Sequence, residues 1–309
     1  MTDHNSIKHN VLYICHNCYG NFLTLKNVNG LGLGFKYIKS QNTGELCLQV
    51  LVKKKEPIYN LNIKDIIPKV YKNIKTDVVE VGAFSGEALN TKIRPTECGY
   101  SVGPANTTSA GTIACIVKRG FNKNIDYFIL SNNHILAQCN SQPIGSVILQ
   151  PSAHDGGVNP EDIIANLSEF IRIDFGNLSG NFNPNTVDCA IAKIINNSII
   201  SNKISWIGYP TGVARAVLGS RVKKTGRSTG RTDGIIRSIG VTGVVSLCGR
   251  LALFQDQFLT DKMSKGGDSG SLVLNYDNKA VGLLFASSSN STLCNNFDDV
   301  LNSLRVELV

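Results

Sequence analysis

The residue pattern best suited to chemistry is Gly266-Gly-Asp-Ser-Gly-Ser271, followed by the apolar run Leu272-Val-Leu274. Glycines on both sides of Ser269 allow a sharp turn that exposes the serine hydroxyl. They also allow the backbone amides of Gly267 and Ser269 to converge on one point, where a developing oxyanion would be stabilised. The same residues suit an ordinary turn between two strands. A nucleophilic role for Ser269 therefore requires a base elsewhere in the chain.

The five histidines include one good candidate for that base. His134 lies in Ser131-Asn-Asn-His-Ile-Leu136, directly after an apolar strand expected over residues 127–131, whereas His154 sits in a loop-like segment and is the weaker candidate. Asp188 opens the apolar run Val187-Asp-Cys-Ala-Ile-Ala-Lys193 and could orient an imidazole. Each residue alone has a structural explanation, as a strand-end histidine or a strand-entry cap. The order His134, Asp188, Ser269 is far more specific than any one of them.

The elements that would position these side chains are mostly strands. Periodic segments are short, β-branched and bounded by Gly, Asn or Pro, which is typical of an all-β chain. The best helix candidate after the start of the chain is the tail, residues 296–304. Residues 1–95 differ, and indicate a small α+β subdomain with a joint near residues 94–104. We therefore expect an N-terminal subdomain over 1–99 and a second domain over 100–309.

Four motifs then resemble those of the trypsin-like (chymotrypsin-fold) serine peptidases. Gly267-Asp-Ser-Gly270 matches the nucleophile motif of that family, and Ser131-Asn-Asn-His134 and Asp188-Cys-Ala-Ile are similar to its histidine and aspartate segments. The segment Lys224-Thr-Gly-Arg-Ser-Thr-Gly-Arg-Thr-Asp-Gly-Ile235 resembles a hairpin of streptogrisin-like bacterial members. The resemblance covers residues 100–309. It implies a double β-barrel, over about 100–205 and 206–309, and a serine endopeptidase with the triad His134, Asp188 and Ser269 and an oxyanion hole of Gly267 and Ser269.

A closer likeness is to bacterial, cytosolic trypsin-like proteins with a leading subdomain. It is carried by Asn27-Val-Asn-Gly-Leu-Gly-Leu-Gly-Phe-Lys36, Thr76-Asp-Val-Val-Glu-Val-Gly82 and Val281-Gly-Leu-Leu-Phe-Ala286. These motifs are less specific, but they extend the resemblance over most of the chain after about residue 25.

Three departures from the family pattern bear on activity. No cut site precedes the first barrel, so Asp268, which would pair with a freshly cut terminus, needs another partner or a site that forms without cleavage. Met263 stands six residues before Ser269, the position that lines the base of the specificity pocket in the family that this chain resembles. The resemblance therefore implies no acidic base that would select Lys or Arg, although Asp261 is near. The substrate-pairing segment is Phe285-Ala-Ser-Ser288. We expect Met263, Phe285, Ala286 and Ser287 to contact substrate and to favour a small or apolar residue before the cut.

Composition excludes several other classes of protein. With 309 residues, 42% hydrophobic and 17% charged, extensive disorder is not expected, and no apolar run approaches the ~18 residues of a membrane span. The net charge of +8 is moderate, and the basic residues between 215 and 231 lack interleaved aromatics, so nucleic acid is not an expected partner. An alternative to the enzyme is a catalytically weak or partner-activated scaffold or regulatory protein.

Cysteine usage bears on location and metals. Nine cysteines without a recognisable export signal favour reduced thiols and a cytoplasmic protein. Cys15-His-Asn-Cys18 is half of a zinc site with no second pair, so free thiols near a flexible terminus are favoured. No metal and no cofactor is predicted. The expected partner is a protein or peptide substrate, with an activating protein partner as a further possibility.

Overall fold

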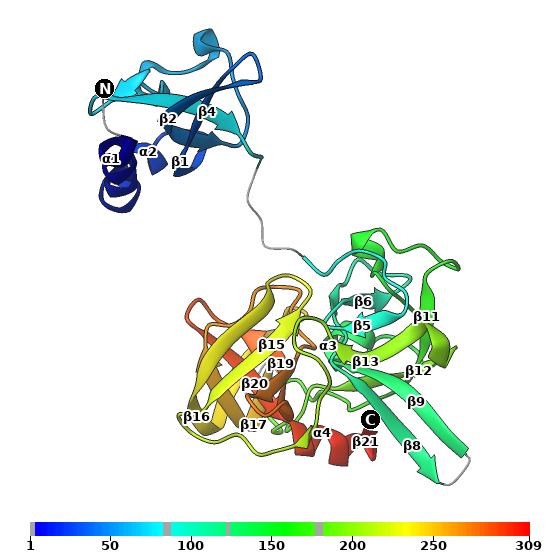
Figure 1. The fold of residues 1–309 in the computed structure, drawn as a ribbon. Helices are drawn as coiled ribbons and strands as arrows, with labels where there is room; N and C mark the ends of the chain where they lie inside the picture. Colours follow the sequence, from blue (N-terminus) through cyan, green and yellow to red (C-terminus); the bar gives the residue numbers. More distant parts are fainter. Residues whose placement is uncertain (1–3, 83–87, 122–123, 177–181) are drawn as a thin grey trace. The chain divides into compact units, whose positions relative to one another are not determined.

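The structure, a computed structural model, describes residues 4–82, 88–121, 124–176 and 182–309 (Figure 1). The chain divides into two compact units, Met1–Ser85 and Gly86–Val309. The expected boundary at residue 99 therefore falls inside the second unit, where β5 (Thr96–Cys98) pairs with β13 (Ile200–Ile204). The two units are described separately.

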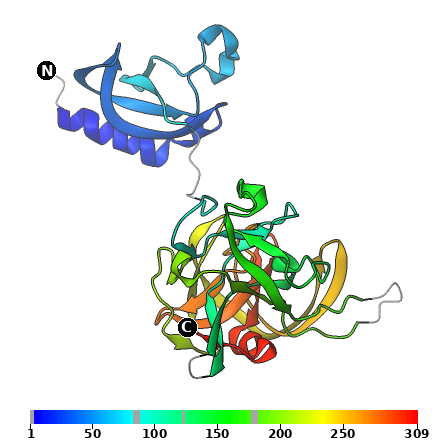
Figure 2. The same cartoon turned by 90° about the vertical axis from the view of Figure 1, so that its right-hand side faces the viewer.

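Unit 1 is a small α+β fold with one four-stranded sheet in the order β1-β2-β4-β3. Its elements are α1 (His4–Asn17), α2 (Gly20–Leu23), β1 (Val28–Ile38), β2 (Gln41–Val52), η1 (Ile58–Asn60), η2 (Ile63–Asp65), β3 (Val70–Tyr71) and β4 (Ile74–Glu80). Helix α1 runs along one face of the sheet (Figure 2), where Val11 and Ile14 pack against Leu48 and Val50.

Helix α1 corrects the expectation of a flexible terminus around Cys15. Its apolar residues Ile7, Val11 and Ile14 are spaced by four and three positions, which puts them on one helix face. Burying that stripe against the sheet stabilises a helix that its polar composition alone does not predict.

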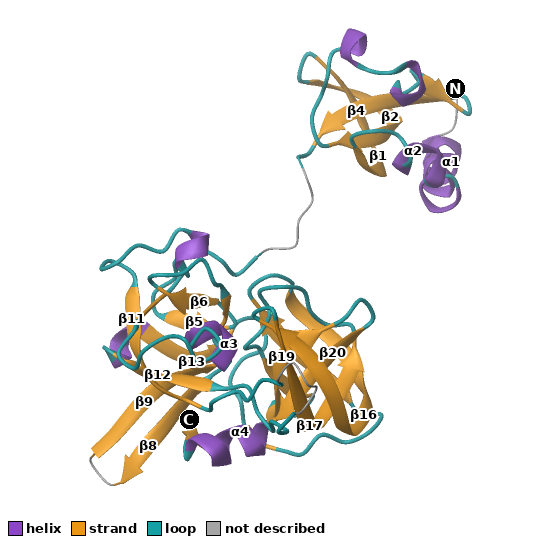
Figure 3. Ribbon diagram, turned by 180° about the vertical axis from the view of Figure 1, so that it is seen from behind, coloured by secondary structure: helices purple, strands orange, loops and turns teal. Residues whose placement is uncertain are grey.

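Unit 2 is the double β-barrel that the sequence predicted, built on two large sheets (Figure 3). Barrel one is built on an eight-stranded sheet in the order β21-β8-β9-β12-β11-β10-β6-β7, with the parallel pair β13-β5 beside it. Its remaining elements are β6 (Ser101–Pro104), β7 (Gly111–Thr112), β8 (Ile116–Phe121), β9 (Asn124–Ser131), α3 (Asn133–Leu136), β10 (Val147–Leu149), η3 (Ala153–Asp155), β11 (Ile163–Phe170), β12 (Ala190–Ile194) and η4 (Asn197–Ile199).

Barrel two is a seven-stranded sheet that closes on itself. Its order is β14-β19-β18-β15-β16-β17-β20, and the additional pairing of β19 with β20 completes the ring. The strands are β14 (Gly212–Val213), β15 (Arg221–Gly226), β16 (Gly230–Leu247), β17 (Arg250–Asp261), β18 (Leu272–Asn275), β19 (Lys279–Ser287) and β20 (Ser291–Asn296). Strands β16 and β17 form a hairpin longer than the sequence predicted, because residues 242–247 also belong to it.

The C-terminal segment joins the two barrels. Helix α4 (Phe297–Leu304) confirms the predicted tail helix, and its apolar residues Phe297, Val300 and Leu304 are fully buried in a core cluster that contains residues of both barrels. Each such burial contributes about 1.5–3 kcal/mol. The chain then adds β21 (Glu307–Leu308) to β8 of barrel one. The last residues therefore hold the barrels in one unit.

The expectation of reduced cysteines throughout the chain is wrong. Cys139 and Cys248 form a disulfide between the segment after α3 and the tip of the β16–β17 hairpin, whereas reduced thiols were expected throughout. Sequence reasoning missed it because the two residues are 109 positions apart. Of the free cysteines, Cys47, Cys98, Cys115, Cys189 and Cys294 are buried. No helix within the described ranges is long and apolar enough to cross a membrane.

Candidate active site

His134 is held at the end of a rigid strand. Strand β9 ends at Ser131, whose hydroxyl donates to the Thr112 carbonyl (2.7 Å), and the chain then makes the single helical turn α3. The Asn132 side-chain amide donates to the backbone carbonyl of Asp188 (2.7 Å). Ile135, directly after the histidine, is buried in the core. The backbone on both sides of His134 is thus fixed, and its imidazole is mostly buried.

Asp188 fixes the orientation of the imidazole. Its fully buried carboxylate accepts the backbone N–H of His134 through Oδ1 (3.1 Å), and its Oδ2 is hydrogen-bonded to His134 Nδ1. Its own N–H donates to Asn295 Oδ1 (3.0 Å) on β20 of barrel two. Because an ionised carboxylate only accepts, Nδ1 carries the proton and Nε2 is left as the basic nitrogen.

Ser269 lies on the glycine-rich turn before β18, and this turn packs on barrel one. Gly267 (φ +96°) and Gly270 (φ +93°) both have left-handed backbone conformations, which favour glycine. A Cβ at Gly270 would overlap the Thr112 carbonyl. The Thr112 N–H donates to the Ser269 carbonyl (2.8 Å), and the Thr112 hydroxyl donates to the Gly267 carbonyl (2.9 Å). Since Thr112 is also bonded to Ser131, one threonine links the two candidate segments.

The amides of Gly267 and Ser269 are oriented by their neighbours. The Gly266 carbonyl accepts the Ser228 hydroxyl (2.7 Å), and the Asp268 carbonyl accepts a backbone N–H three residues further along (3.0 Å). In a trans peptide group the N–H points away from the carbonyl oxygen, so these two contacts fix the directions of the Gly267 and Ser269 N–H groups. Among the described residues, the N–H groups of Gly267 and Ser269 have no acceptor. The N–H groups of Asp268, Gly270 and Ser271 in the same turn are hydrogen-bonded. Both groups are thus free to bind an oxyanion.

Asp268 has a charged partner within the chain. The Lys224 ammonium lies 3.5 Å from its Oδ2, and both side chains are fully buried. Its Oδ1 also accepts the backbone N–H groups of Ser228 (2.8 Å) and Thr229 (3.1 Å). Burial lowers the pKa of Lys224, and the Asp268 carboxylate partly offsets this. Lys224 therefore occupies the electrostatic position that a cut terminus was expected to fill.

His134 and Ser269 line the same cavity, of about 580 Å³. Phe285, Ala286 and Ser287 also line it, together with part of the β16–β17 hairpin, residues Val244–Cys248. Within the described residues, the lining does not include Met263, which is buried in the core of barrel two, or His154, which is exposed. Met263 thus receives no support here as a substrate contact.

Asp261, the nearby acidic residue, does not face this cavity either. Its carboxylate pairs with the Arg237 guanidinium (2.7 Å) and accepts the Ile235 N–H (3.0 Å). The cavity lining instead combines serines with apolar side chains, among them Leu247, Leu259 and Leu293, and contains no carboxylate among the described residues. An acidic specificity pocket is therefore not formed by this residue.

Sequence reasoning missed four contributors to the site. Lys224 was grouped with the other basic residues between 215 and 231, although the unpaired Asp268 was a signal that a buried cation was needed. Thr112 and Asn295 act through backbone and amide hydrogen bonds that no motif encodes. The hairpin tip around Cys248 depends on a disulfide between distant residues.

The comparisons with known proteins find similarity among solved structures. Neither the protein-family models nor the curated proteins match the chain. Protease A of Thermobifida fusca is 18% identical, with 69% of this chain and 99% of that chain covered and a TM-score of 0.49. The chymotrypsin of Cellulomonas bogoriensis is 16% identical, with the same coverages and a TM-score of 0.47. The Nocardiopsis protease is 17% identical, again with the same coverages and a TM-score of 0.48.

Proposed function

We propose that this chain is a serine endopeptidase that cleaves peptide bonds through an acyl-enzyme. The observation that carries the proposal is the hydrogen bond between His134 Nδ1 and the buried Asp188 carboxylate, in a cavity that His134 shares with Ser269. This arrangement leaves Nε2 as the nitrogen that can take up a serine proton. The function rests on these contacts and not on the similarities to solved structures.

The proposed reaction has two halves. Ser269 Oγ attacks the carbonyl carbon of the scissile peptide, and His134 Nε2 takes the hydroxyl proton and then gives it to the leaving amine. The Gly267 and Ser269 amides hold the oxyanion, where the loss of one donor costs about 2.7–4 kcal/mol in comparable sites. Water, deprotonated by the same imidazole, then releases the acyl group. Asp188 stabilises the imidazolium in both halves.

The cavity lining favours a small or apolar residue before the cut. The side chains of Leu259, Phe285 and Leu293 supply apolar surface, and Asp261 is engaged by Arg237. A buried basic side chain would lack a counter-charge there, and desolvating it would be costly. We expect cleavage after small or apolar residues.

The alternative of a partner-activated regulatory protein rested on the missing activating terminus and on the extra leading subdomain. The Lys224–Asp268 pair supplies that charge internally. It favours a site that forms without cleavage or a partner, and so favours the enzyme.

A bacterial, cytoplasmic origin stays a prediction from the sequence. The Cys139–Cys248 disulfide is the observation that argues the other way, because disulfides are rare in reducing compartments.

A proteolysis assay tests the proposed function. The purified wild-type chain is incubated with a diverse peptide library, and the cleavage sites are mapped by mass spectrometry. We expect cleavage by the wild type and none by Ser269→Ala, with the matched control Ser246→Ala, from the same cavity, still active. Equal product formation by wild type and Ser269→Ala, or none by either, would contradict the proposal.

A further inference from the structure

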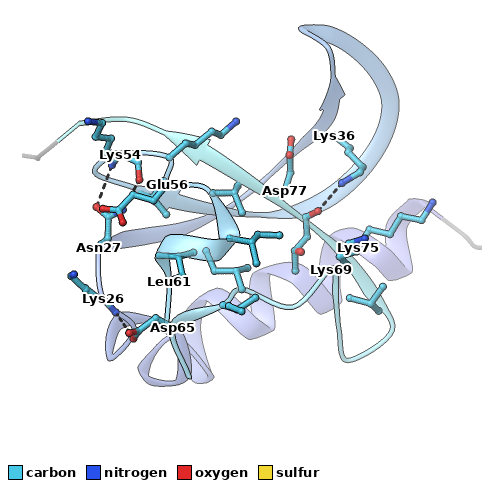
Figure 4. A pocket seen from close by; sticks show the side chains of 18 residues that line it. Lys26, Asn27, Lys36, Lys54, Glu56, Leu61, Asp65, Lys69, Lys75 and Asp77 are labelled. Carbon is cyan, nitrogen blue, oxygen red and sulfur yellow. Dashed lines mark hydrogen bonds between the residues drawn. The ribbon is translucent and has the colours of Figure 1, made fainter. Parts of the chain in front are cut away.

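Unit 1 contains a cavity of about 660 Å³ with a strongly basic lining (Figure 4). Residues 1–85 hold eleven lysines, no arginine and six acidic residues. Six of those lysines line this one cavity: Lys26, Lys36, Lys54, Lys55, Lys69 and Lys75. The volume is in the range of ligand-binding pockets, about 300–1,000 Å³. The endopeptidase proposal does not use this cavity.

The lysines form two groups at opposite ends of the cavity. At one end the Asn27 side chain accepts the Lys54 backbone N–H (3.2 Å), with Lys26 beside it. At the other end the Lys36 ammonium donates to the Thr76 carbonyl (2.8 Å), next to Lys69 and Lys75. Figure 4 shows the two groups on opposite sides of the apolar part of the lining.

Most of these ammonium groups lack a counter-charge. Within the described residues, Lys75 is the one lysine of the six that forms an ion pair, with Glu45 (2.8 Å). The lining also holds three carboxylates, those of Glu56, Asp65 and Asp77, so its six lysines leave a net charge of 6 − 3 = +3. The cavity is therefore electrostatically complementary to an anionic ligand.

The lining between the two lysine groups is apolar. It is supplied by strands β2 and β4 and by the segment that connects β2 to β3: Val52, Leu61, Ile66, Ile67 and Val78. Among the described residues, no aromatic side chain on which a nucleic-acid base could stack lines the cavity. A ligand that fills the cavity thus presents apolar groups in its middle and negative charge at both ends.

Strand β4 also offers an unpaired edge beside the cavity. Strand β3 covers only the start of β4, where Tyr71 pairs with Ile74 and Val70 with Lys75. The N–H and carbonyl of Thr76 point to this outer side, since they bond Lys69 and Lys36. Because the backbone groups of successive strand residues point to alternate sides, the N–H and carbonyl of Val78, two residues further along, point the same way as those of Thr76. Among the described residues the backbone of Val78 has no partner on that side.

We propose that unit 1 binds an extended peptide whose apolar residues are flanked by acidic ones, by strand addition to β4. Backbone hydrogen bonds to Val78 would hold the peptide on the sheet edge, and alternate apolar side chains would enter the cavity. Acidic residues on both flanks would meet the two lysine groups. A fatty acid has a single charged end and would satisfy only one group.

The test uses the full chain carrying Ser269→Ala, so that the probe is not cut. The probe is a fluorescein-labelled peptide, Glu-Glu-Val-Thr-Val-Thr-Val-Glu-Glu, and binding is followed by fluorescence anisotropy. We expect saturable binding that weakens with salt, and no binding of the matched peptide with Lys in place of Glu. The peptide can be N-methylated at alternate residues in two ways, at the odd-numbered or at the even-numbered positions, without any change to the protein. Because only every second N–H of an added strand faces the sheet edge, one of these two forms should not bind.

A charge-reversed variant assigns the binding to this cavity. Lys54→Glu with Lys69→Glu should raise the Kd by about tenfold or more, because opposite-charge contacts become like-charge ones. Lys8→Glu with Lys39→Glu makes the same change in net charge outside the cavity, and should change the Kd by less than about twofold. Circular dichroism verifies that both variants fold.

Several results would overturn the proposal. These are no saturable binding of the acidic peptide, equal binding by the two double variants, equal binding of the basic peptide, or full binding of both N-methylated forms. Binding of dodecanoate or of a twelve-residue oligothymidylate in place of the peptide would also overturn it. None of these results depends on catalysis, so each is distinct from a failure of the endopeptidase proposal.

Discussion

The ammonium group of Lys224 lies 3.5 Å from the carboxylate of Asp268, the residue before Ser269, and both side chains are fully buried. Lys224 is carried by β15, whereas Asp268 belongs to the turn before β18. The charge pair therefore connects a strand of barrel two to the turn that bears the proposed nucleophile. A buried carboxylate without such a partner would carry a large desolvation penalty.

Replacing Lys224 should disrupt the proposed oxyanion hole. In Lys224→Met the Asp268 carboxylate stays buried without its counter-charge, and breaking a buried pair costs about 3–5 kcal/mol. We expect peptide hydrolysis to be lost and the free energy of unfolding to fall by that amount, as measured by urea denaturation. Lys223→Met is the control, because the Lys223 ammonium lies over the Tyr276 ring, away from the turn. Full activity of Lys224→Met would contradict this role.

The same lysine predicts an alkaline limit to activity. Burial lowers the pKa of Lys224 below the ordinary 10.5, despite the opposing effect of Asp268. As the pH rises through this lowered pKa, the ammonium loses its proton and Asp268 loses its charged partner. The alkaline decline of kcat/KM should therefore begin at a pH lower than 10.5. Between the folded and unfolded pKa values the unfolded chain binds more protons, so this titration by itself does not unfold the protein.

A pH profile of Lys224→Arg checks that assignment. Arginine stays protonated throughout this range, so the alkaline limb of kcat/KM should move to higher pH. Superimposable limbs in the wild type and in Lys224→Arg would assign the limit to another group.

A second charge pair, which is partly buried, predicts acid sensitivity. Arg227 donates to both carboxylate oxygens of Asp155 (2.6 and 2.5 Å), across the two barrels. Burial opposes ionisation of Asp155, but the bonds from Arg227 and Ser101 hold its pKa below the ordinary 3.8. A depressed folded-state pKa gives stability that is present above the unfolded pKa and is lost as the pH falls through the folded pKa.

Asp155→Asn should therefore lower the free energy of unfolding at pH 7, and lower it less at acidic pH. We expect a loss of about 3–5 kcal/mol in the free energy of unfolding at pH 7. Urea denaturation of wild type and variant, both carrying Ser269→Ala, should show the difference shrinking below pH 3.8. A difference that is independent of pH would disprove the linkage.

The disulfide should support the substrate cavity. It ties Cys139, which follows the His134 turn, to Cys248 at the hairpin tip that lines the cavity. Cys248→Ser should lower the free energy of unfolding by about 2–4 kcal/mol, the typical value for such cross-links. It should also raise KM, because the hairpin wall is no longer anchored. Cys15→Ser in unit 1 is the control, and an unchanged KM in Cys248→Ser would exclude this role.

Local patterns sufficed to predict the elements that carry the site. The strand before His134, the apolar strand after Asp188 and the glycine-rich turn around Ser269 all depend on residues close in sequence. Their types and spacing therefore predicted both the β-rich fold and the candidate site residues.

Contacts between distant residues could not be predicted in this way. The partner of Asp268, the link through Thr112 and the Cys139–Cys248 bond depend on how the barrels pack. From sequence alone, a lysine among other basic residues is expected to be exposed to solvent, whereas the fold buries Lys224. Likewise, the polar helix α1 acquires its stability from the sheet that it covers.

The most direct measurement is the site of reaction with a fluorophosphonate probe, located by tandem mass spectrometry of the labelled, digested chain. The probe reacts with an activated serine hydroxyl and needs no knowledge of the natural substrate. We predict a single adduct on Ser269 in the wild type, and none in Ser269→Ala or His134→Ala. An adduct elsewhere, or equal labelling of wild type and Ser269→Ala, would contradict the assignment of Ser269 as the nucleophile.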